Sequence, residues 1–343
     1  MPLGEESLRV VIAGATTLRG KDLKEWIDQS GFPAGEVRLV DEELAAGTLT
    51  EVAGEPAVVG LADSTSFDKA HFVFFTGSRT FAAKYGPAAL AAGAAVIDLS
   101  RGLAGAPGAR SWIPALDPLL PAAPETKKGT NGGAQSRLYI CPSASGIVAS
   151  SLATVFAPVG QKRLAITFFQ PVSERGPEGI EELEHQTIKL LSFQPMPQAV
   201  FDTQVAFNLL DRWGTESKER LGDARHALRE EVRAFLNGRA PVPAVTLIQA
   251  PVFYANAFSA YAEFAEPVEA AALVSRLEAA GFKATGEDEG PSNLSVAGEE
   301  KPAIGRPERD PSTERGYWFW GAADNMRVAT ANAVSIAERI LAS

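Results

Sequence analysis

The stretch Leu8-Arg-Val-Val-Ile-Ala-Gly-Ala-Thr-Thr-Leu-Arg-Gly20 decides the fold expected for the first part of the chain. Its opening segment, Leu8–Ala13, holds a run of β-branched side chains, as strands buried in a parallel sheet do. A glycine-spaced turn from Gly14 to Gly20 follows, and then an amphipathic helix that reaches Ile27. A strand, a glycine turn and a helix in this order predict the start of a βαβ unit.

Further short apolar runs continue this pattern through about the first 140 residues. Parallel strands are joined by right-handed crossovers, so these segments predict an open twisted sheet with helices on both faces, which is a Rossmann-type fold. The predicted strands are 37–40, 57–61, 72–75 and 95–97, and a helix is predicted at 85–92.

The pattern changes near residue 143, where the apolar runs become longer. Such runs suit a mixed or antiparallel sheet with one covered face, and they predict a second domain of the α+β class. Residues 286–314 are dense in Gly, Pro, Glu and Asp, which predicts a surface loop. The strands predicted here are 164–172, 244–248, 260–264 and 317–320, and the helices are 178–191, 217–236, 267–280 and 324–341.

Charge and composition exclude several classes of protein. The chain has 343 residues, with 32 Lys and Arg against 42 Asp and Glu, a net charge of −10. An acidic chain without a compact basic run repels phosphate backbones, so we expect no nucleic-acid partner. No apolar stretch reaches the roughly 20 residues of a membrane helix, so we expect no membrane association.

Cysteine and histidine are scarce. The single cysteine, Cys141, excludes an internal disulfide and fits a reducing compartment, and the N-terminus lacks the basic-then-apolar order of a signal peptide. We therefore expect a cytoplasmic protein. Three histidines and one cysteine are little material for a zinc site, so no metal site is predicted, and His71 is assigned no role.

The turn after the first strand is a candidate cofactor site. Backbone N–H groups at Gly14, Thr16, Thr17 and Gly20, together with the helix N-terminus, could receive a dinucleotide pyrophosphate. Thr17 stands where the middle glycine of the usual pattern belongs. Its Cβ would obstruct the closest approach, although its hydroxyl could bond a phosphate. Gly77 is a further candidate contact with the dinucleotide. The alternative is that the spacing of Gly14 and Gly20 is that of a plain βα turn with no ligand, for which it is equally typical.

Asp41 stands at the end of a predicted strand, about 21 residues beyond Gly20. An acid at this place can bond a ribose 2′-OH and repels a 2′-phosphate. If a dinucleotide binds, NAD is therefore favoured over NADP. The alternative is that Asp41 and Glu42 form a solvated acidic pair with no ligand.

The segment Cys141-Pro-Ser-Ala-Ser-Gly146 precedes a predicted helix. Seryl hydroxyls at such a position usually act as N-caps. A nucleophilic role for Ser143 or Ser145 is the alternative, but no histidine is near in the sequence and no Gly-x-Ser-x-Gly elbow is present.

Read together, blocks along nearly the full chain resemble the aspartate-semialdehyde dehydrogenase family. The opening Val-Ile-Ala-Gly-Ala-Thr-Thr at 11–17 matches that family's V-x-x-x-G-A-T-G start, and Gln-Pro-Val-Ser-Glu-Arg-Gly at 170–176 resembles its Q-A-V-S-G-A-G block. The resemblance implies a dinucleotide-binding domain at 1–142, a dimerisation domain at 143–321, and a C-terminal helix at 322–343 that packs on the first domain. Similar blocks lie at 75–80, 84–87, 95–100, 179–187, 207–208, 305–310 and 324–333.

The resemblance also implies where the family's chemistry would lie. That family reduces an acyl phosphate, or runs the reverse oxidation, through a thioester on a cysteine, with NAD(P) as the cofactor. The cysteine position falls on Ala144, the substrate-binding arginine on Gln249 and the catalytic histidine on Asn256. Cys141 lies three residues away, beyond Pro142, too far to keep an attack distance of about 3–3.5 Å.

These replacements predict a member of the family that cannot run the thioester reaction. We expect a homodimer with a binding or regulatory role, with NAD, NADP or no dinucleotide bound. One alternative is an NAD(P)-dependent oxidoreductase of the same fold that acts on a different substrate. Another is a partner subunit of a related active dehydrogenase.

Overall fold

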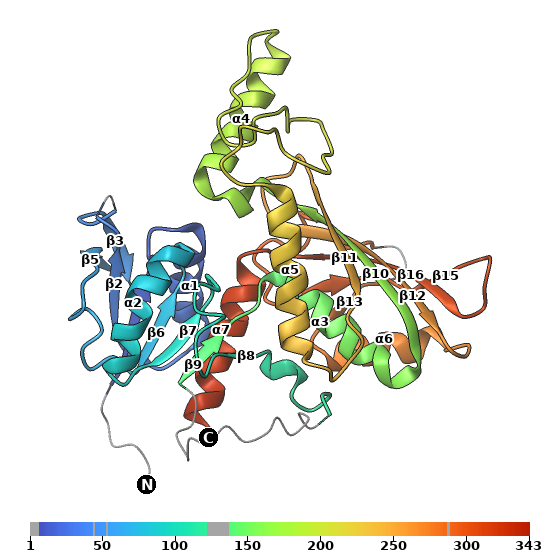
Figure 1. The fold of residues 1–343 in the computed structure, drawn as a ribbon, viewed down its shortest axis with the longest axis horizontal. Helices are drawn as coiled ribbons and strands as arrows, with labels where there is room; N and C mark the ends of the chain where they lie inside the picture. Colours follow the sequence, from blue (N-terminus) through green and yellow to red (C-terminus); the bar gives the residue numbers. More distant parts are fainter. Residues whose placement is uncertain (1–6, 44, 53, 122–136, 287–288) are drawn as a thin grey trace. The chain divides into compact units, whose positions relative to one another are not determined.

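Figure 1 shows the computed structural model of the chain, which describes residues 7–43, 45–52, 54–121, 137–286 and 289–343. The chain divides into two compact units. Unit 1 comprises the described residues within 1–114, 127–142 and 329–343, and unit 2 comprises those within 115–126 and 143–328. The predicted domain boundaries at 142 and 321 stay a prediction.

Unit 1 is built on a parallel sheet whose central strand is β1 (Leu8–Ala13). β1 pairs in parallel with β2 (Ala34–Asp41) on one side and with β6 (Phe72–Phe75) on the other. In the described residues the strand order is β5-β2-β1-β6-β7-β9-β8, with β5 at Gly60–Leu61, β7 at Ala95–Asp98, β8 at Arg110–Ser111 and β9 at Leu138–Ile140. A separate hairpin joins β3 (Leu49–Val52) to β4 (Glu55–Val58).

Both faces of this sheet are covered, which explains the unbroken apolar run of β1. Val10 and Ile12 point into a core that also holds residues of α1 (Leu18–Ser30) and α7 (Arg327–Leu341). Val11 and Ala13 point into a second core with α2 (Arg79–Ala91). Side chains alternate along a strand, so each face needs every second residue to be apolar.

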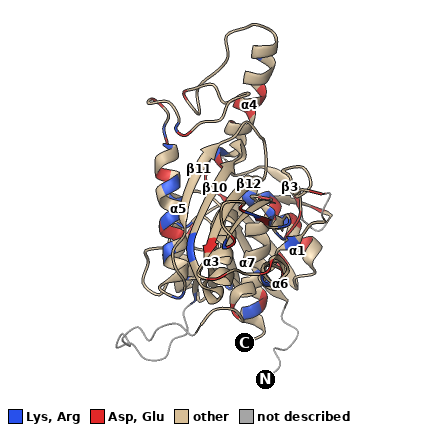
Figure 2. Ribbon diagram, turned by 90° about the vertical axis from the view of Figure 1, so that its right-hand side faces the viewer, with Lys and Arg blue, Asp and Glu red and all other residues tan. Residues whose placement is uncertain are grey.

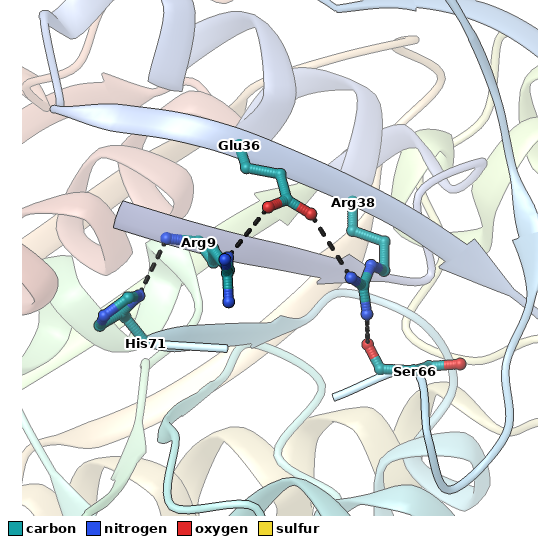
Figure 3. A network of polar contacts seen from close by, with 5 residues as sticks. All are labelled: Arg9, Glu36, Arg38, Ser66 and His71. Atoms are coloured by element: carbon teal, nitrogen blue, oxygen red, sulfur yellow. Dashed lines mark hydrogen bonds and ion pairs between the residues drawn. The ribbon is translucent and has the colours of Figure 1, made fainter. Parts of the chain in front are cut away.

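A polar network lies toward the end of this sheet that is opposite to Gly14 (Figure 3). Glu36 binds Arg9 at 3.0 Å and Arg38 at 3.4 Å, and Arg38 also donates to the Ser66 carbonyl at 2.9 Å. His71 accepts the backbone N–H of Arg9 through Nδ1 at 3.0 Å. The structure thus gives His71 a structural contact with the start of β1, 62 positions earlier in the chain.

Unit 2 is built on a mixed sheet with the order β11-β10-β12-β16-β14-β13. Within it, β10 (Gln161–Gln170) pairs in parallel with β11 (Ala244–Gln249) and antiparallel with β12 (Asn256–Phe264). The remaining strands are β13 (Lys283–Ala284), β14 (Ala303–Ile304), β15 (Glu308–Arg309), which pairs with β16, and β16 (Gly316–Ala323).

Helices cover one face of the second sheet and leave the other partly exposed (Figure 1). The covering helices include α3 (Ala144–Phe156), α5 (Leu221–Leu236) and α6 (Ala270–Ala279), and every residue of α3 is buried. Aromatic rings fill the covered side, where Phe156 lies 5.1 Å from Phe319 between ring centroids. α4 (Gly176–Leu191) is the remaining long helix of this unit in the described residues.

The predicted fold class is confirmed, including the return of the C-terminal helix to unit 1. Three local predictions were wrong. Residues 286–314 are not all loop, because β14 and β15 gain hydrogen-bond partners from β16. The helix expected at 85–92 begins at Arg79, because the Ser78 side chain caps it, and the strand expected at 57–61 is divided between β4 and β5. Within the described ranges, no helix is long and apolar enough to cross a membrane.

Candidate functional site

The turn after β1 is closed by contacts among glycines. Gly14 has a φ of +97°, and a Cβ built there would lie 2.2 Å from the backbone nitrogen of Gly77. A Cβ on Gly20 would lie 2.3 Å from the Gly14 carbonyl oxygen. Each of these positions requires a residue without a side chain. The structure therefore brings Gly14, Gly20 and Gly77 together, in the place where the sequence analysis put a cofactor site.

Thr17 is the N-cap of α1. Its hydroxyl accepts a hydrogen bond from the Gly20 N–H at 2.9 Å and lies 2.8 Å from the Gly14 carbonyl, to which it donates. The proton of the Thr17 hydroxyl is therefore already used in a hydrogen bond within the turn. The phosphate contact predicted for Thr17 stays a prediction.

Asp41 is the last residue of β2, and its carboxylate binds the turn that follows β1. Its Oδ2 accepts hydrogen bonds from the backbone and the hydroxyl of Thr16, at 2.8 and 2.6 Å, and its Oδ1 accepts the Glu42 N–H at 2.9 Å. Asp41 is only 5% exposed. A ribose 2′-OH would have to share a carboxylate that already accepts three hydrogen bonds, so the predicted ribose contact stays a prediction.

The donors of this turn are mostly used within the chain. Gly14 and Ala15 donate their N–H groups to the Val40 carbonyl, and Thr17 donates to the Gly14 carbonyl. A pyrophosphate would therefore be received at the first turn of α1, from Leu18 onward, where the helix dipole favours an anion. The glycine packing and this helix start fit a dinucleotide, which would supply the hydride acceptor or donor of a dehydrogenase.

A cavity of about 430 Å³ opens beside the carboxyl end of β2. Glu42, which also accepts a hydrogen bond from the Ser78 hydroxyl at 3.2 Å, lies in its wall. Lys84 is the cation among the lining residues, and a hydrogen bond to Tyr85, with a smaller contribution from Glu42, raises the pKa of its ammonium group. The lining residues are Glu42, Glu43, Leu61, Ala62, Thr80, Phe81, Lys84 and Tyr85.

A second candidate site lies in unit 2, at the start of α3. Ser143 is the N-cap, and its hydroxyl accepts the Gly146 N–H at 3.1 Å, which confirms the capping role expected for a serine here. Glu231 of α5 accepts hydrogen bonds through Oε1 from both the N–H and the hydroxyl of Ser143, at 2.5 and 2.8 Å. Ala144 is the first residue of the helix and is buried. A carboxylate therefore occupies the helix N-terminus beside Ala144.

Two buried carboxamides lie at one end of the sheet of unit 2. Gln249 ends β11, and its Nε2 donates to the Gln170 carbonyl at 2.9 Å and to the Ala250 carbonyl at 3.1 Å. Asn256 begins β12. Neither side chain is exposed to more than 1%, and Gln249 Oε1 and Asn256 Oδ1 have no hydrogen-bond partner in the described residues.

Cys141 is a packing residue of unit 1. Its side chain is fully buried in the core under α7, its Sγ lies 3.2 Å from the Ala329 carbonyl oxygen, and the Asn332 side chain donates to it at 3.3 Å. A buried thiol in such surroundings is chemically inert. In the described residues no group of three or more His, Cys, Asp or Glu could hold a metal ion.

Two family models match this chain. The NAD binding domain of semialdehyde dehydrogenase matches residues 9–118, and the semialdehyde dehydrogenase dimerisation domain matches residues 152–328. The chain belongs to the semialdehyde dehydrogenase family.

Relatives of this semialdehyde dehydrogenase-family chain match it end to end. A USG-1 protein homolog of Pseudomonas aeruginosa is 30% identical over 345 residues, which cover 98% of each chain. Aspartate-semialdehyde dehydrogenase 2 of Vibrio cholerae is 27% identical and also covers 98% of each. The solved structure of a probable aspartate-semialdehyde dehydrogenase from P. aeruginosa has a TM-score of 0.84 and 30% identity, and the match covers 98% of this chain and 99% of that one.

These matches confirm the family predicted from the sequence and support a nucleotide cofactor for unit 1. Whether Ala144, Gln249 and Asn256 hold the family's catalytic positions stays a prediction.

Sequence reasoning missed Glu231, which lies 88 residues from the serine that it binds. Acidic and basic residues both occur along α5 (Figure 2), and Glu231 directly follows Glu230, so nothing in the linear pattern distinguishes this glutamate from its neighbours.

Proposed function

We propose that this semialdehyde dehydrogenase-family protein does not run the phosphate-dependent thioester reaction and has a binding or regulatory role. It binds a dinucleotide through unit 1, with NAD preferred over NADP, and it forms a dimer through unit 2. The partner is a second copy of this chain or a related active dehydrogenase.

The start of α3 carries this proposal. Thioester chemistry needs a nucleophile, and a thiol at a helix N-terminus gains thiolate character from the dipole. Ala144 offers a methyl group there instead, and the carboxylate of Glu231 lies on the adjacent Ser143. A fixed negative charge disfavours both a thiolate and an anionic acyl phosphate at this point.

The other two replacements support the same conclusion. An asparagine at Asn256 cannot exchange a proton at neutral pH, so no general base stands at the histidine position. The amide of Gln249 is held by two backbone carbonyls and carries no charge, so it cannot replace a bidentate arginine that binds a carboxylate. The nucleophile, the general base and the substrate-binding cation act as a unit in catalysis, so the loss of all three is consistent with the loss of the reaction.

The preference for NAD rests on the charges beside β2. Asp41 is buried as an acceptor of three hydrogen bonds, and Glu42 and Glu43 line the neighbouring cavity. Lys84 offsets one of these charges. The net negative charge opposes a 2′-phosphate, whereas a ribose hydroxyl can donate to a carboxylate.

One experiment tests both parts of the proposal. The purified protein is assayed with aspartate semialdehyde, phosphate and either dinucleotide, and NAD and NADP are titrated by calorimetry. We expect no turnover above about 1% of a median kcat of roughly 10 s⁻¹, and weak binding that favours NAD. Turnover in the ordinary enzyme range would reject the loss of chemistry, and tighter binding of NADP would reject the assignment of Asp41.

An oxidoreductase that acts on a different substrate is the second candidate. The hydrogen bond of 2.8 Å from the Ser143 hydroxyl to Glu231 favours it, because it places a carboxylate beside a serine. The same hydroxyl also caps α3, however, and a carboxylate is a weak base for an alcohol. Dinucleotide reduction with a panel of aldehydes that disappears in both Ser143→Ala and Glu231→Gln would support this candidate.

A further inference from the structure

Arginines of α5 line the outer edge of the second sheet. β11 is the first strand in the order of this sheet, and α5 packs beside it (Figure 1). The Nε of Arg229 donates to the Val245 carbonyl at 2.8 Å. A terminal nitrogen of Arg225 donates to the Leu247 carbonyl at 3.0 Å. The two arginines therefore bind backbone acceptors that the edge of a sheet otherwise leaves to solvent.

Arg229 uses only part of its guanidinium group in this contact. Its two terminal nitrogens are not needed for the hydrogen bond to Val245, and within the described residues no carboxylate pairs with Arg229. Arg233, one helical turn further along α5, instead binds Glu230 at 2.7 Å. A guanidinium that is held through Nε has a fixed orientation, and its terminal N–H groups form a fork that matches a carboxylate. The contact with β11 thus orients a group that can bind an anion.

A cavity of about 550 Å³ lies beside this group. Arg229 and Arg233 both line it, and its described lining holds no acidic residue. Thr167 and Thr246, which pair with each other in the register of β10 and β11, add two hydroxyl groups. The remaining lining residues carry apolar side chains and are Ala165, Ile166, Val242, Pro243, Ala244 and Val245.

The lining therefore combines positive charge, hydroxyl groups and an apolar wall. Its volume lies within the range of about 300–1,000 Å³ that is typical of small-molecule pockets. An inorganic anion would leave the apolar wall in contact with water, and a neutral apolar molecule would leave the guanidinium without a counter-ion. The whole chain has a net charge of −10, so its overall field repels anions, and an anion has to be held by local contacts.

We propose that this cavity binds a small carboxylate that carries an apolar chain or ring. The carboxylate accepts hydrogen bonds from the terminal N–H groups of Arg229, and Arg233 adds positive charge. The apolar part of the ligand lies along Val242 and Pro243. All of these residues belong to unit 2 and none is in the proposed dinucleotide site, so the inference goes beyond the proposed function and does not depend on it.

Calorimetry with three probes tests this proposal without any dinucleotide. 3-Phenylpropionate carries a carboxylate and a ring, 3-phenylpropylamine carries a cation on a similar body, and acetate carries a carboxylate alone. We expect 3-phenylpropionate to bind about tenfold or more tightly than either other probe, because it alone matches both the guanidinium and the apolar wall. Equal binding of the three probes, tighter binding of the amine, or no binding of 3-phenylpropionate overturns the proposal.

A pair of matched arginine variants locates the binding. Arg229→Gln removes the charge and the fork, and it should weaken 3-phenylpropionate binding by about tenfold or more. Arg276→Gln makes the same change on the exposed surface of α6, outside the cavity, and should alter the affinity by less than about twofold, since a distant charge is screened. Equal weakening in the two variants would indicate general electrostatics and reject the site.

A further variant leaves the hydrogen bonds of β11 in place. Arg229→Gln also removes the Nε contact with Val245, so its effect could arise from a loosened sheet edge. Val242 is 45% exposed and precedes β11, and Val242→Asp places a carboxylate in the apolar wall without removing a hydrogen bond. This variant should also weaken 3-phenylpropionate binding by about tenfold or more, because like charges repel. Unchanged affinity in Val242→Asp rejects the cavity as the binding site.

Discussion

A methyl group occupies position 144, where a helix begins and a carboxylate is already bound. We predict that Ala144→Cys alone will not produce turnover, because no base stands at Asn256 and no cation at Gln249. The measurement is phosphate-dependent reduction of NAD or NADP by the single variant. It is compared with the triple variant that also carries Gln249→Arg and Asn256→His. Activity in the single variant would show that the histidine position has been misassigned.

The acidity of the thiol introduced by Ala144→Cys tests whether Glu231 acts on this position. A neighbouring carboxylate raises the pKa of a thiol and so opposes the helix dipole. Adding Glu231→Gln to Ala144→Cys should therefore increase the fraction of thiolate severalfold at neutral pH. The thiolate is measured by its ultraviolet absorbance, because position 144 is buried and excludes alkylating reagents. The parent protein, in which Cys141 is the single cysteine, gives the background. An equal thiolate fraction with and without Glu231 would place the carboxylate too far away to act.

Thr16 carries the hydrogen bond that joins the glycine turn to β2. Thr16→Val keeps the shape and the backbone N–H but removes the hydroxyl bond of 2.6 Å to Asp41. A hydrogen bond to a charged group contributes about 1.5–3 kcal/mol, so we expect unfolding in urea to become easier by about that amount. Thr80→Val, on the exposed start of α2, is the matched control and should change stability by less than about 0.5 kcal/mol.

At the scale of elements, the junction of α3 and α5 depends on a glycine. A Cβ at Gly146 would lie 1.9 Å from Glu231 Oε1, so Gly146→Ala must displace the carboxylate from Ser143. We predict that Gly146→Ala destabilises the parent protein by about 1–3 kcal/mol, which is the value of the lost hydrogen bonds.

In a Glu231→Ala background the main obstacle is gone, and the Ser143 hydroxyl oxygen, 3.2 Å from the added Cβ, is the nearest remaining atom. The same Gly146→Ala change should then stabilise by up to about 1 kcal/mol, because alanine favours a helix more than glycine does. Chemical denaturation of the four proteins gives the coupling free energy. Additive effects would contradict the arrangement of Glu231 on α3.

The elements that the sequence predicted well are those with a local signal. β1 and β6 were placed at or near their observed ends because their side chains are apolar on both faces. β14 and β15 have only two residues each and exist because β16 supplies their hydrogen bonds. A partner that is distant in sequence leaves no periodic pattern in such short segments.

The residues of the candidate sites also divide into those with a local sequence signal and those whose role depends on a distant partner. Gly14 and Gly20 were predictable because a glycine turn between a strand and a helix is a local pattern. The internal roles of Thr16 and Asp41 were not, because the two residues are 25 positions apart and meet only through the pairing of β1 with β2. The unpaired oxygens of Gln249 and Asn256 are likewise visible only when all their neighbours are placed.

At the scale of the molecule, the open face of the second sheet is expected to hold the dimer. Trp318 is 46% and Trp320 is 44% exposed, and the Tyr261 ring lies 4.9 Å from that of Trp318. An exposed aromatic face of this kind marks an interface. We predict that Trp318→Glu together with Trp320→Glu converts a dimer to a monomer in light scattering. Leu294→Glu, at an apolar residue that is 89% exposed, should leave the dimer intact.

The course of protein synthesis gives the position of α7 a further consequence. Its residues from Ala329 onward complete the core beneath Val10 and Ile12, yet the ribosome makes them only after all of unit 2. At about 5–20 residues per second, the interval after Pro142 is roughly 10–40 s. During that time one face of the first sheet has the cover of α1 but lacks that of α7. The nascent chain therefore presents an apolar surface to chaperones for tens of seconds, and the half that is made first is the last to finish folding.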